Sequence, residues 1–273
     1  MSDSRLTRIA PTPSGFLHLG NAVNFALTAL LAQRWDAGIY LRIDDMDADR
    51  VRSEYIDDIF DMVEWIDIPK LAGASDRSDF EQNFTMARRK DYYRSQLGLL
   101  GDSGLDVFVC SCSRVELAAS GSLRCVGQCR ERGLRLAAGE SALRVAIPDG
   151  TIVRMGDRDI DLASTHGDVV LWRRDDHPAY HLVTVIEDRD LGVTDIVRGA
   201  DLIDSSALHA WLAPHLGASN VAEANFVHHE LLVDSTGHKL SKSTLGSGPL
   251  ARTDRLRDEV SSIARRLASG LGY

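Results

Sequence analysis

Two short segments, far apart in the sequence, carry residue types suited to binding a phosphate chain. The first, Gly15 to Asn21, is a glycine-flanked turn around His18 that opens directly into a helical pattern. A helix amino terminus offers unpaired N–H groups and a partial positive charge. The second places Lys239 and Lys242 beside small hydroxyl residues, where two ammonium groups can contact a triphosphate from a closing loop. Taken singly, these segments are also explained by simple turn chemistry and by a solvated loop.

The four cysteines form a third candidate site, because all of them lie between Cys110 and Cys129. Cys110 and Cys112 are separated by one residue, and Cys125 and Cys129 follow after twelve intervening residues. Four thiolates so close in sequence predict a tetrahedral structural zinc site. The alternative is four free thiols in a core. Four cysteines are too few for a disulfide scaffold in a chain of 273 residues.

The elements that must position the first segment form a βαβ unit. Arg5 to Ala10 is predicted to be a strand, Asn21 to Trp35 a helix that stops before Gly38, and Ile39 to Ile43 a buried strand. In such units ligands bind at the carboxyl ends of the strands. The remaining predictions are helices at Glu54 to Trp65, Phe84 to Leu100, Ser205 to Leu216 and Asp254 to Leu267, and strands at Val169 to Arg173, Tyr180 to Glu187, Asp195 to Val197 and His228 to Val233.

Composition restricts the class of protein. With 44% hydrophobic and 26% charged residues in 30.0 kDa, the chain is typical of folded globular proteins. We find no apolar run long enough to span a membrane, and the polar segment Met1 to Arg8 does not resemble a signal peptide, so a cytoplasmic protein without a membrane partner is expected. A monomer is also expected.

The net charge of -9 argues against binding nucleic acid through bulk positive charge. Any such binding needs a local patch. Arginines around the cysteines could supply one, although a solvated charged face explains them about as well. They are Arg114, Arg124, Arg130, Arg132, Arg135 and Arg144.

Together and in this order, the segments Pro11 to Gly20 and Lys239 to Ser243 resemble the two signatures of class I aminoacyl-tRNA synthetases. Further matches resemble the glutamate and glutamine branch of that class. In length and in the segment Arg198 to Ser205, the chain most resembles the glutamyl-Q tRNA(Asp) synthetases, truncated relatives that attach glutamate to queuosine and lack an anticodon-binding region. The resemblance covers roughly residues 5 to 245, and the branch matches are Arg8 to Gly15, Leu41 to Asp45, Ala179 to Leu182 and Val197 to Leu202.

The resemblance implies an α/β fold, a Rossmann-like class I catalytic domain with a zinc-binding insertion and a short C-terminal helical region. The expected segments are 1–105 and 168–245 for the two halves of the catalytic domain, 106–167 for the insertion that binds zinc and the acceptor, and 246–273 for the helical tail. The family's metal block often has a tyrosine where this chain has Cys125. Zinc would be held by Cys110, Cys112, Cys125 and Cys129.

The resemblance also assigns site residues. His18, Lys239 and Lys242 would be catalytic, and ATP with its Mg²⁺ would be bound by Thr12, His18, Gly20, Asn21, Lys239, Ser241 and Lys242. Glutamate would be bound by Arg8, Ala10, Thr12, Asp44, Tyr180 and Arg198. Two arginines and one carboxylate complement an amino acid with two carboxylates and one ammonium group. The same arginines and Asp44 could instead form ordinary ion pairs.

The expected activity is formation of glutamyl-adenylate from ATP and glutamate, followed by transfer of glutamate to queuosine of tRNA(Asp). Bacterial glutamate enzymes usually have Glu at the position of Asp44, so glutamine stays open as the substrate. Two alternatives remain: a truncated activating enzyme with another tRNA, a carrier protein or a small molecule as acceptor, and a catalytically silent tRNA-binding relative.

Overall fold

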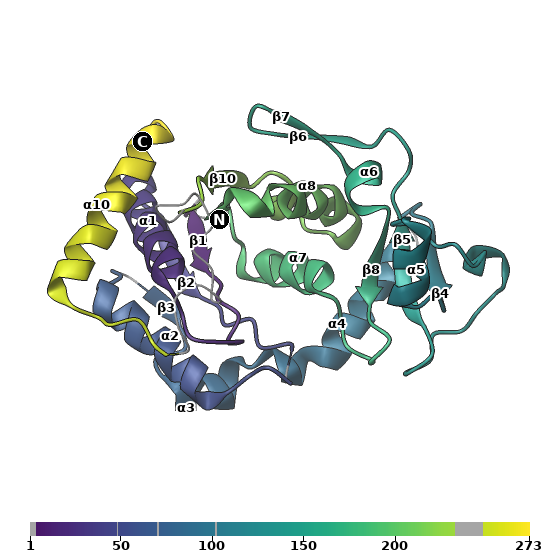
Figure 1. Cartoon of the computed structure of the whole chain (residues 1–273), viewed down its shortest axis with the longest axis horizontal. Helices are drawn as coiled ribbons and strands as arrows, with labels where there is room; N and C mark the ends of the chain where they lie inside the picture. Colours follow the sequence, from purple (N-terminus) through teal and green to yellow (C-terminus); the bar gives the residue numbers. More distant parts are fainter. Residues whose placement is uncertain (1–3, 48, 70, 102, 233–247) are drawn as a thin grey trace. The chain divides into compact units, whose positions relative to one another are not determined.

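The computed structural model describes residues 4–47, 49–69, 71–101, 103–232 and 248–273. The chain divides into two compact units (Figure 1). Unit 1 comprises Met1–Arg88, Val193–Leu202 and Asn225–Tyr273, and unit 2 comprises Arg89–Gly192 and Ile203–Ala224. Because each unit is built from separated stretches of sequence, neither corresponds to a continuous segment of the chain.

Unit 1 contains a parallel five-stranded sheet (Figure 1). Its strands lie in the order β3-β2-β1-β9-β10, which is 3-2-1-4-5 in order of appearance in this sheet. This is the strand order of the Rossmann fold. The order in which strands are added to the sheet reverses between β1 and β9, and such sheets bind ligands at this point. The predicted α/β fold is therefore confirmed. The strands are β1 (Leu6–Ile9), β2 (Gly38–Leu41), β3 (Leu71–Gly73), β9 (Asp195–Gly199) and β10 (Asn225–His229).

Two long helices of unit 1 pack against each other, α1 (Leu19–Trp35) and α10 (Asp254–Gly270) (Figure 1). Leu27 and Leu31 of α1 share a buried cluster with Ala264 and Ala268 of α10, whose small side chains allow close approach. The predicted C-terminal helix is thus part of the core of unit 1. The other helical elements here are α2 (Ser53–Ile66), α3 (Arg77–Asp79), η1 (Phe80–Phe84), η2 (Met86–Arg89) and η5 (Ala200–Leu202).

Unit 2 contains an antiparallel three-stranded sheet in the order β4-β5-β8 and a hairpin, β6-β7 (Figure 1). Its strands are β4 (Val107–Cys110), β5 (Ala142–Ala146), β6 (Ile152–Met155), β7 (Arg158–Asp161) and β8 (Asp168–Trp172). Its helices are α4 (Lys90–Gln96), η3 (Leu97–Leu100), α5 (Arg114–Ser120), η4 (Cys129–Glu131), α6 (Leu162–His166), α7 (Tyr180–Leu191), α8 (Ile203–Leu212), η6 (Ala213–Leu216) and α9 (Ser219–Ala222).

One predicted strand is wrong: Tyr180 to Glu187 belongs to the helix α7, which ends where Gly192 takes a left-handed conformation. Every residue from Leu182 to Asp188 is buried, so this part of the helix has no exposed face. A helix buried on all sides shows no helical periodicity, and a short apolar run of this kind also fits a strand.

Other boundaries shift. The helix predicted at Phe84 to Leu100 is broken by extended Thr85, and its α-helical part is only α4. The helix at Ser205 to Leu216 starts earlier and turns into a 3₁₀ helix at Ala213, beside a proline. The strand at His228 to Val233 is β10, which ends at His229, and Val233 lies outside the described residues. The strand at Val169 to Arg173 is β8, which pairs with β5 in the antiparallel sheet.

Candidate active site and metal centre

His18 caps the amino terminus of α1. Its Nδ1 accepts a hydrogen bond from the Gly20 backbone N–H at 3.0 Å, and the His18 backbone N–H donates to Asn21 Oδ1 at 3.0 Å. An accepting Nδ1 carries no proton, so in the neutral ring the proton lies on Nε2. A Cβ on Gly20 would lie 2.9 Å from His18 Cε1, so this glycine is what allows the ring to fold over the helix end. The structure thus brings three of the expected ATP-binding residues together.

The turn before this cap is anchored by Asp58 of α2. Asp58 is 3% exposed, and its Oδ2 accepts a hydrogen bond from the Leu17 N–H at 2.7 Å. Its other oxygen forms an ion pair with Arg252, whose guanidinium also donates to the Asp58 carbonyl oxygen at 3.0 Å. One buried carboxylate therefore joins α2, the turn that bears His18, and the segment leading into α10. The sequence analysis missed Asp58 because its partners are remote in the sequence.

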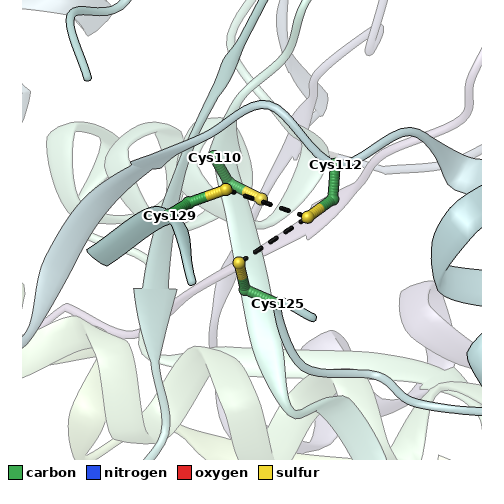
Figure 2. A group of neighbouring side chains, drawn as sticks. All are labelled: Cys110, Cys112, Cys125 and Cys129. Atoms are coloured by element: carbon green, nitrogen blue, oxygen red, sulfur yellow. Dashed lines mark hydrogen bonds between the residues drawn. The ribbon is translucent and has the colours of Figure 1, made fainter. Parts of the chain in front are cut away.

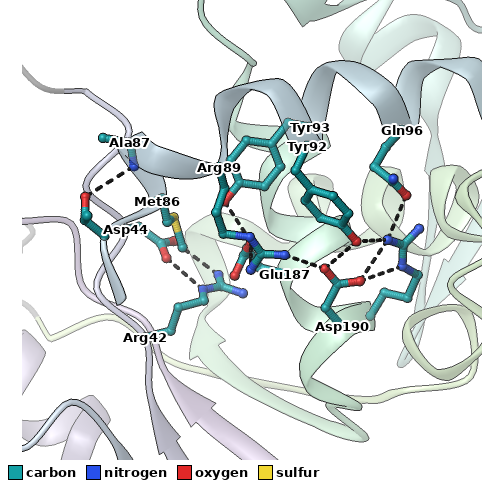
Figure 3. Close-up of polar contacts among 12 residues, drawn as sticks. Arg42, Asp44, Met86, Ala87, Arg89, Tyr92, Tyr93, Gln96, Glu187 and Asp190 are labelled. Carbon is teal, nitrogen blue, oxygen red and sulfur yellow. Dashed lines mark hydrogen bonds and ion pairs between the residues drawn. The ribbon is translucent and has the colours of Figure 1, made fainter. Parts of the chain in front are cut away.

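Asp44, the expected ammonium partner, forms a bidentate ion pair with Arg42 (Figure 3). Arg42 Nε donates to Asp44 Oδ1 at 2.7 Å, and Nη2 donates to Oδ2 at 3.1 Å. Both side chains are largely buried, with 4% and 14% of their surfaces exposed. The sequence analysis gave Arg42 no role, although it lies within the matched segment Leu41 to Asp45. An ammonium group bound by Asp44 would share the carboxylate with this guanidinium.

The segments that follow β1 and β2 lie side by side. The Arg42 N–H donates to the Ile9 carbonyl oxygen and the Asp44 N–H to the Pro11 carbonyl oxygen, both at 2.9 Å. These bonds bring Asp44 next to the segment that contains the expected residues Ala10 and Thr12. The two sequence-distant pieces of the candidate glutamate site in unit 1 therefore meet at the carboxyl ends of adjacent parallel strands.

The two expected carboxylate-binding arginines belong to neighbouring strands of the same sheet. Arg8 lies on β1 and Arg198 on β9, and each residue is 5% exposed. The Arg198 guanidinium also lies 5.9 Å from the Phe226 ring centroid, within reach of a cation–π contact. Both arginines are buried charges in unit 1, on the strands between which the sheet reverses its order.

The end of β10 is tied to α1 by His229. Its Nδ1 lies 2.8 Å from the Glu230 carbonyl oxygen, which can only accept, so Nδ1 carries the proton. Nε2 therefore accepts from the Asn24 side-chain amide at 3.0 Å. Burial lowers the pKa of His229, which favours the neutral ring that this arrangement requires. A neutral His229 thus fixes the end of β10. There it pairs with Gly199 of β9, the residue that follows Arg198.

Tyr180 begins α7 in unit 2 and is 47% exposed. It lies in a group of rings, with centroids 5.1 Å from the His181 ring and 5.5 Å from the His209 ring. His181 Nδ1 and His209 Nε2 are 3.0 Å apart, so one of these nitrogens donates and the other accepts. The group orients Tyr180 at the start of its helix.

Helix α7 is held against α4 by a polar network (Figure 3). Arg89, at the start of α4, forms 2.6 Å ion pairs with Glu187 and Asp190 of α7. The Tyr93 hydroxyl donates to Glu187 and the Tyr92 hydroxyl to Asp190, both at 2.7 Å. Because Glu187 is 5% exposed, its charge is compensated rather than solvated, and the network fixes the helix that carries Tyr180.

The four cysteines converge (Figure 2). Their sulfur atoms all lie within 4.8 Å of one another, with Cys112 Sγ 3.7 Å from Cys125 Sγ and 3.8 Å from Cys129 Sγ. A tetrahedron with metal–sulfur bonds of about 2.3 Å has edges of about 3.8 Å. A Cβ on Gly127 would lie 3.0 Å from Cys112 Sγ, so a side chain there would crowd the cluster. The donor set and its spacing fit a tetrahedral metal ion.

Contacts from neighbouring residues orient the cysteine ligands and shift their pKa values. Asp168, 2% exposed, accepts hydrogen bonds from the Cys125 N–H at 2.6 Å and from Arg130 at 2.7 Å, which fixes the second ligand pair. Burial opposes ionisation of Cys129, but hydrogen bonds from Ser111 and neighbouring thiols outweigh it and lower its pKa to about 6. Burial raises the pKa of Cys110 to about 12. Hydrogen bonds to the residues that ligate a metal orient these residues toward the ion.

Several of the arginines expected to form a basic patch are paired within unit 2. Arg124 pairs with Asp149, and Arg130 pairs with Asp168 and Asp106. These pairs compensate the charge of two of the six arginines. Within the described residues, no helix has the length and apolar character to cross a bilayer. Lys239, Ser241 and Lys242 lie outside the described residues.

Comparison with known proteins agrees with the fold. Residues 5–258 match the family "tRNA synthetases class I (E and Q), catalytic domain". The glutamate–tRNA synthetase of Elizabethkingia anophelis has the same fold, with a TM-score of 0.66 at 20% identity over 94% of this chain and 54% of its own. The chain thus spans about half of that synthetase.

The curated relatives are closer in sequence. The glutamyl-Q tRNA(Asp) synthetase of Methylococcus capsulatus is 36% identical over 252 residues, covering 89% of this chain and 77% of the relative. That of Parasynechococcus marenigrum is 37% identical over 268 residues, covering 97% and 83%. The family match and these relatives show a ligase of the class I aminoacyl-tRNA synthetase type. The chain belongs to the glutamate and glutamine family of that class and, within it, to the glutamyl-Q tRNA(Asp) synthetases.

Proposed function

We propose that the chain activates glutamate with ATP and transfers it to queuosine of tRNA(Asp). In the first step the glutamate α-carboxylate attacks the α-phosphorus of ATP, which forms glutamyl-adenylate and releases pyrophosphate. In the second step a nucleophilic group of queuosine attacks the activated carbonyl and AMP leaves. The proposal rests on the capped amino terminus of α1 at the carboxyl edge of the parallel sheet, together with the relatives' activity.

Activation needs positioning and charge stabilisation more than acid–base chemistry, because the carboxylate is already a nucleophile. His18 would donate from Nε2 to phosphate oxygens, since its Nδ1 accepts from Gly20. The α1 amino terminus adds a partial positive charge. We assign Lys239 and Lys242 to the leaving pyrophosphate, and Mg²⁺ would arrive bound to ATP.

For glutamate, we assign Arg8 and Tyr180 to the side chain, Asp44 to the ammonium group and Arg198 to a carboxylate, with Ala10 and Thr12 alongside. Arg8 and Arg198 are buried, and buried guanidinium groups bind carboxylates strongly and with defined geometry. The Arg42–Asp44 pair fixes the Asp44 carboxylate before substrate arrives. A preorganised acceptor of this kind favours an ammonium group over a neutral group.

We assign zinc to the four cysteines. Because all four positions of a tetrahedral ion would be filled by the chain, the ion would have no open position for substrate. Its role would be to hold the loop between β4 and β5 in shape. The Asp168 and Ser111 contacts would keep Cys125 and Cys129 oriented toward it.

The test measures ATP:pyrophosphate exchange without tRNA, with glutamate and with glutamine. Glutamate should support exchange, and Lys242→Ala should reduce it by on the order of a hundredfold or more without loss of the fold. Lys90→Ala, which removes the same charge from a half-buried pair with Asp176, is the matched control. Exchange driven by glutamine, or near-normal exchange in Lys242→Ala, would refute the assignment.

The acceptor is tested separately. Wild-type protein should attach glutamate to tRNA(Asp) that contains queuosine and leave tRNA(Asp) without queuosine uncharged. Equal charging of both would place the acceptor elsewhere on the tRNA. Exchange activity without charging of either tRNA would favour a different acceptor, and absence of both activities would favour a non-catalytic binder.

A further inference from the structure

We propose that a cleft in unit 2, beside the cysteine cluster, binds a phosphodiester group of the RNA substrate. The inference rests on the proposed function, because it takes the partner to be tRNA. The cleft has a volume of about 430 Å³, within the range of sites that hold a small molecule or one nucleotide-sized group. Its lining includes Cys112, Arg144, Arg173, Arg174 and Asp175.

Three arginines but only one carboxylate line this cleft. Arg144 comes from β5, and Arg173 and Arg174 follow β8 directly, so two adjacent antiparallel strands bring the three groups together. From the sequence, Arg144 was expected only as one arginine of a local basic patch, and no role was expected for Arg173 or Arg174. The tertiary structure brings these three arginines together in one cleft.

Arg144 gives the strongest sign of a missing anion. The residue is 8% exposed, and its Nη1 donates to the Asp168 carbonyl oxygen at 2.8 Å. Its Nε is buried with no hydrogen-bond partner, and Arg144 forms no ion pair with any residue that the structure describes. A buried guanidinium without a counter-charge is costly, so an anion entering the cleft would be bound with a favourable electrostatic free energy.

Arg173 and Arg174 can exchange their present partners for a ligand in the cleft. Arg173 pairs with Asp175, but their side chains are 34% and 50% exposed, and a pair this exposed contributes little. Arg174 donates from Nη2 to the Ser111 carbonyl oxygen at 2.6 Å, which orients the guanidinium and leaves its other N–H groups to bind a ligand. Adjacent guanidinium groups suit the oxygens of a phosphodiester, which they bind in a bidentate manner.

Because the net charge of the chain is -9, binding of RNA depends on a local site of this kind. A strongly acidic protein repels RNA at long range, so the binding free energy must come from a few local contacts. A rival role for Arg173 and Arg174 is to neutralise the negative charge of a tetrathiolate metal site, since Cys112 also lines the cleft. The two roles differ in what the arginines stabilise, RNA or metal.

The test is the Arg173→Ala/Arg174→Ala double variant. Arg154→Ala/Arg158→Ala, on the exposed hairpin β6-β7, removes the same charge from the same unit and is the matched control. Binding of queuosine-containing tRNA(Asp) is measured by fluorescence anisotropy over a series of salt concentrations. Each lost phosphate contact should reduce the slope of log K against log salt by about 0.7 to 0.9. We expect a loss of one to two contacts and at least tenfold weaker binding in the cleft variant only.

Zinc content and glutamate-dependent exchange, including its ATP dependence, should be unchanged in that variant. An affinity and salt slope equal to those of the control would overturn the proposal. Loss of zinc with an unchanged salt slope would also overturn it in favour of charge neutralisation, and a raised KM for ATP would assign the cleft to free nucleotide. Absence of exchange in wild-type protein would refute the proposed function. The salt dependence of RNA binding tests the cleft independently of exchange activity.

Discussion

Replacement of Asp58 by alanine should strongly destabilise unit 1, because this buried carboxylate serves two partners. It accepts from the Leu17 N–H at 2.7 Å and forms an ion pair with Arg252, whose side chain is 17% exposed. Hydrogen bonds to charged groups contribute about 1.5 to 3 kcal/mol each, and breaking a buried ion pair costs about 3 to 5 kcal/mol. We therefore expect Asp58→Ala to lower the free energy of unfolding by about 3 to 5 kcal/mol.

The neighbouring residue provides the control. Asp57 also pairs with an arginine, Arg77, but the two side chains are 50% and 43% exposed. An exposed pair contributes at most about 1 kcal/mol, so Asp57→Ala should shift the urea midpoint only slightly. Urea unfolding followed by circular dichroism gives both values as the change in midpoint multiplied by the slope m.

A double-mutant cycle separates the two contacts of Asp58. Arg252→Ala leaves the Leu17 bond in place, so it should cost less than Asp58→Ala, with a coupling energy between the two sites of about 1 to 3 kcal/mol. Because Leu17 precedes the His18 cap, Asp58→Ala protein that remains folded should also show a raised KM for ATP in exchange. The reasoning is refuted if Asp58→Ala costs no more than Asp57→Ala.

Two further predictions concern unit 2. Wild-type protein should contain one zinc ion per chain by elemental analysis, and Cys125→Ser should lose it to a chelator at an at least tenfold lower concentration, because a neutral hydroxyl replaces a thiolate; equal retention would remove Cys125 from the ligand set. Hydrogen bonds from Lys90 and Trp172, with the charge of Arg94, lower the pKa of Asp176 to about 2. The stability from this shift is present above about pH 4 and is lost as pH falls toward 2. Asp176→Asn should therefore cost about 1 kcal/mol at pH 7, after allowance for solvent screening, and its gap in urea midpoint from wild type should narrow as pH falls from 5 to 3; a constant gap would contradict this.

Local patterns in the sequence determined the parts of this protein that depend on close spacing. The His18 cap joins residues two and three positions apart, so the segment Gly15 to Asn21 carries its own geometry. Cysteines spaced by one and three residues favour ligand pairs in the same way, and Cys110 to Cys129 forms a cluster as predicted. The βαβ unit around α1 was also predicted, from apolar residues at helical spacing between Asn21 and Trp35 and from the glycines that bound this segment.

Tertiary structure decided what depends on burial and on distant partners. The segment Tyr180 to Glu187 lies in a helix that is buried on every side from Leu182 onward, and no pattern within the segment distinguishes that from a strand. Asp58 meets Arg252 across 194 positions, and Arg144, Arg173 and Arg174 gather because β5 pairs with β8. Whether a charged side chain is paired, buried or available to a ligand depends on contacts between residues that are far apart in the sequence. Local patterns in the sequence do not show these contacts.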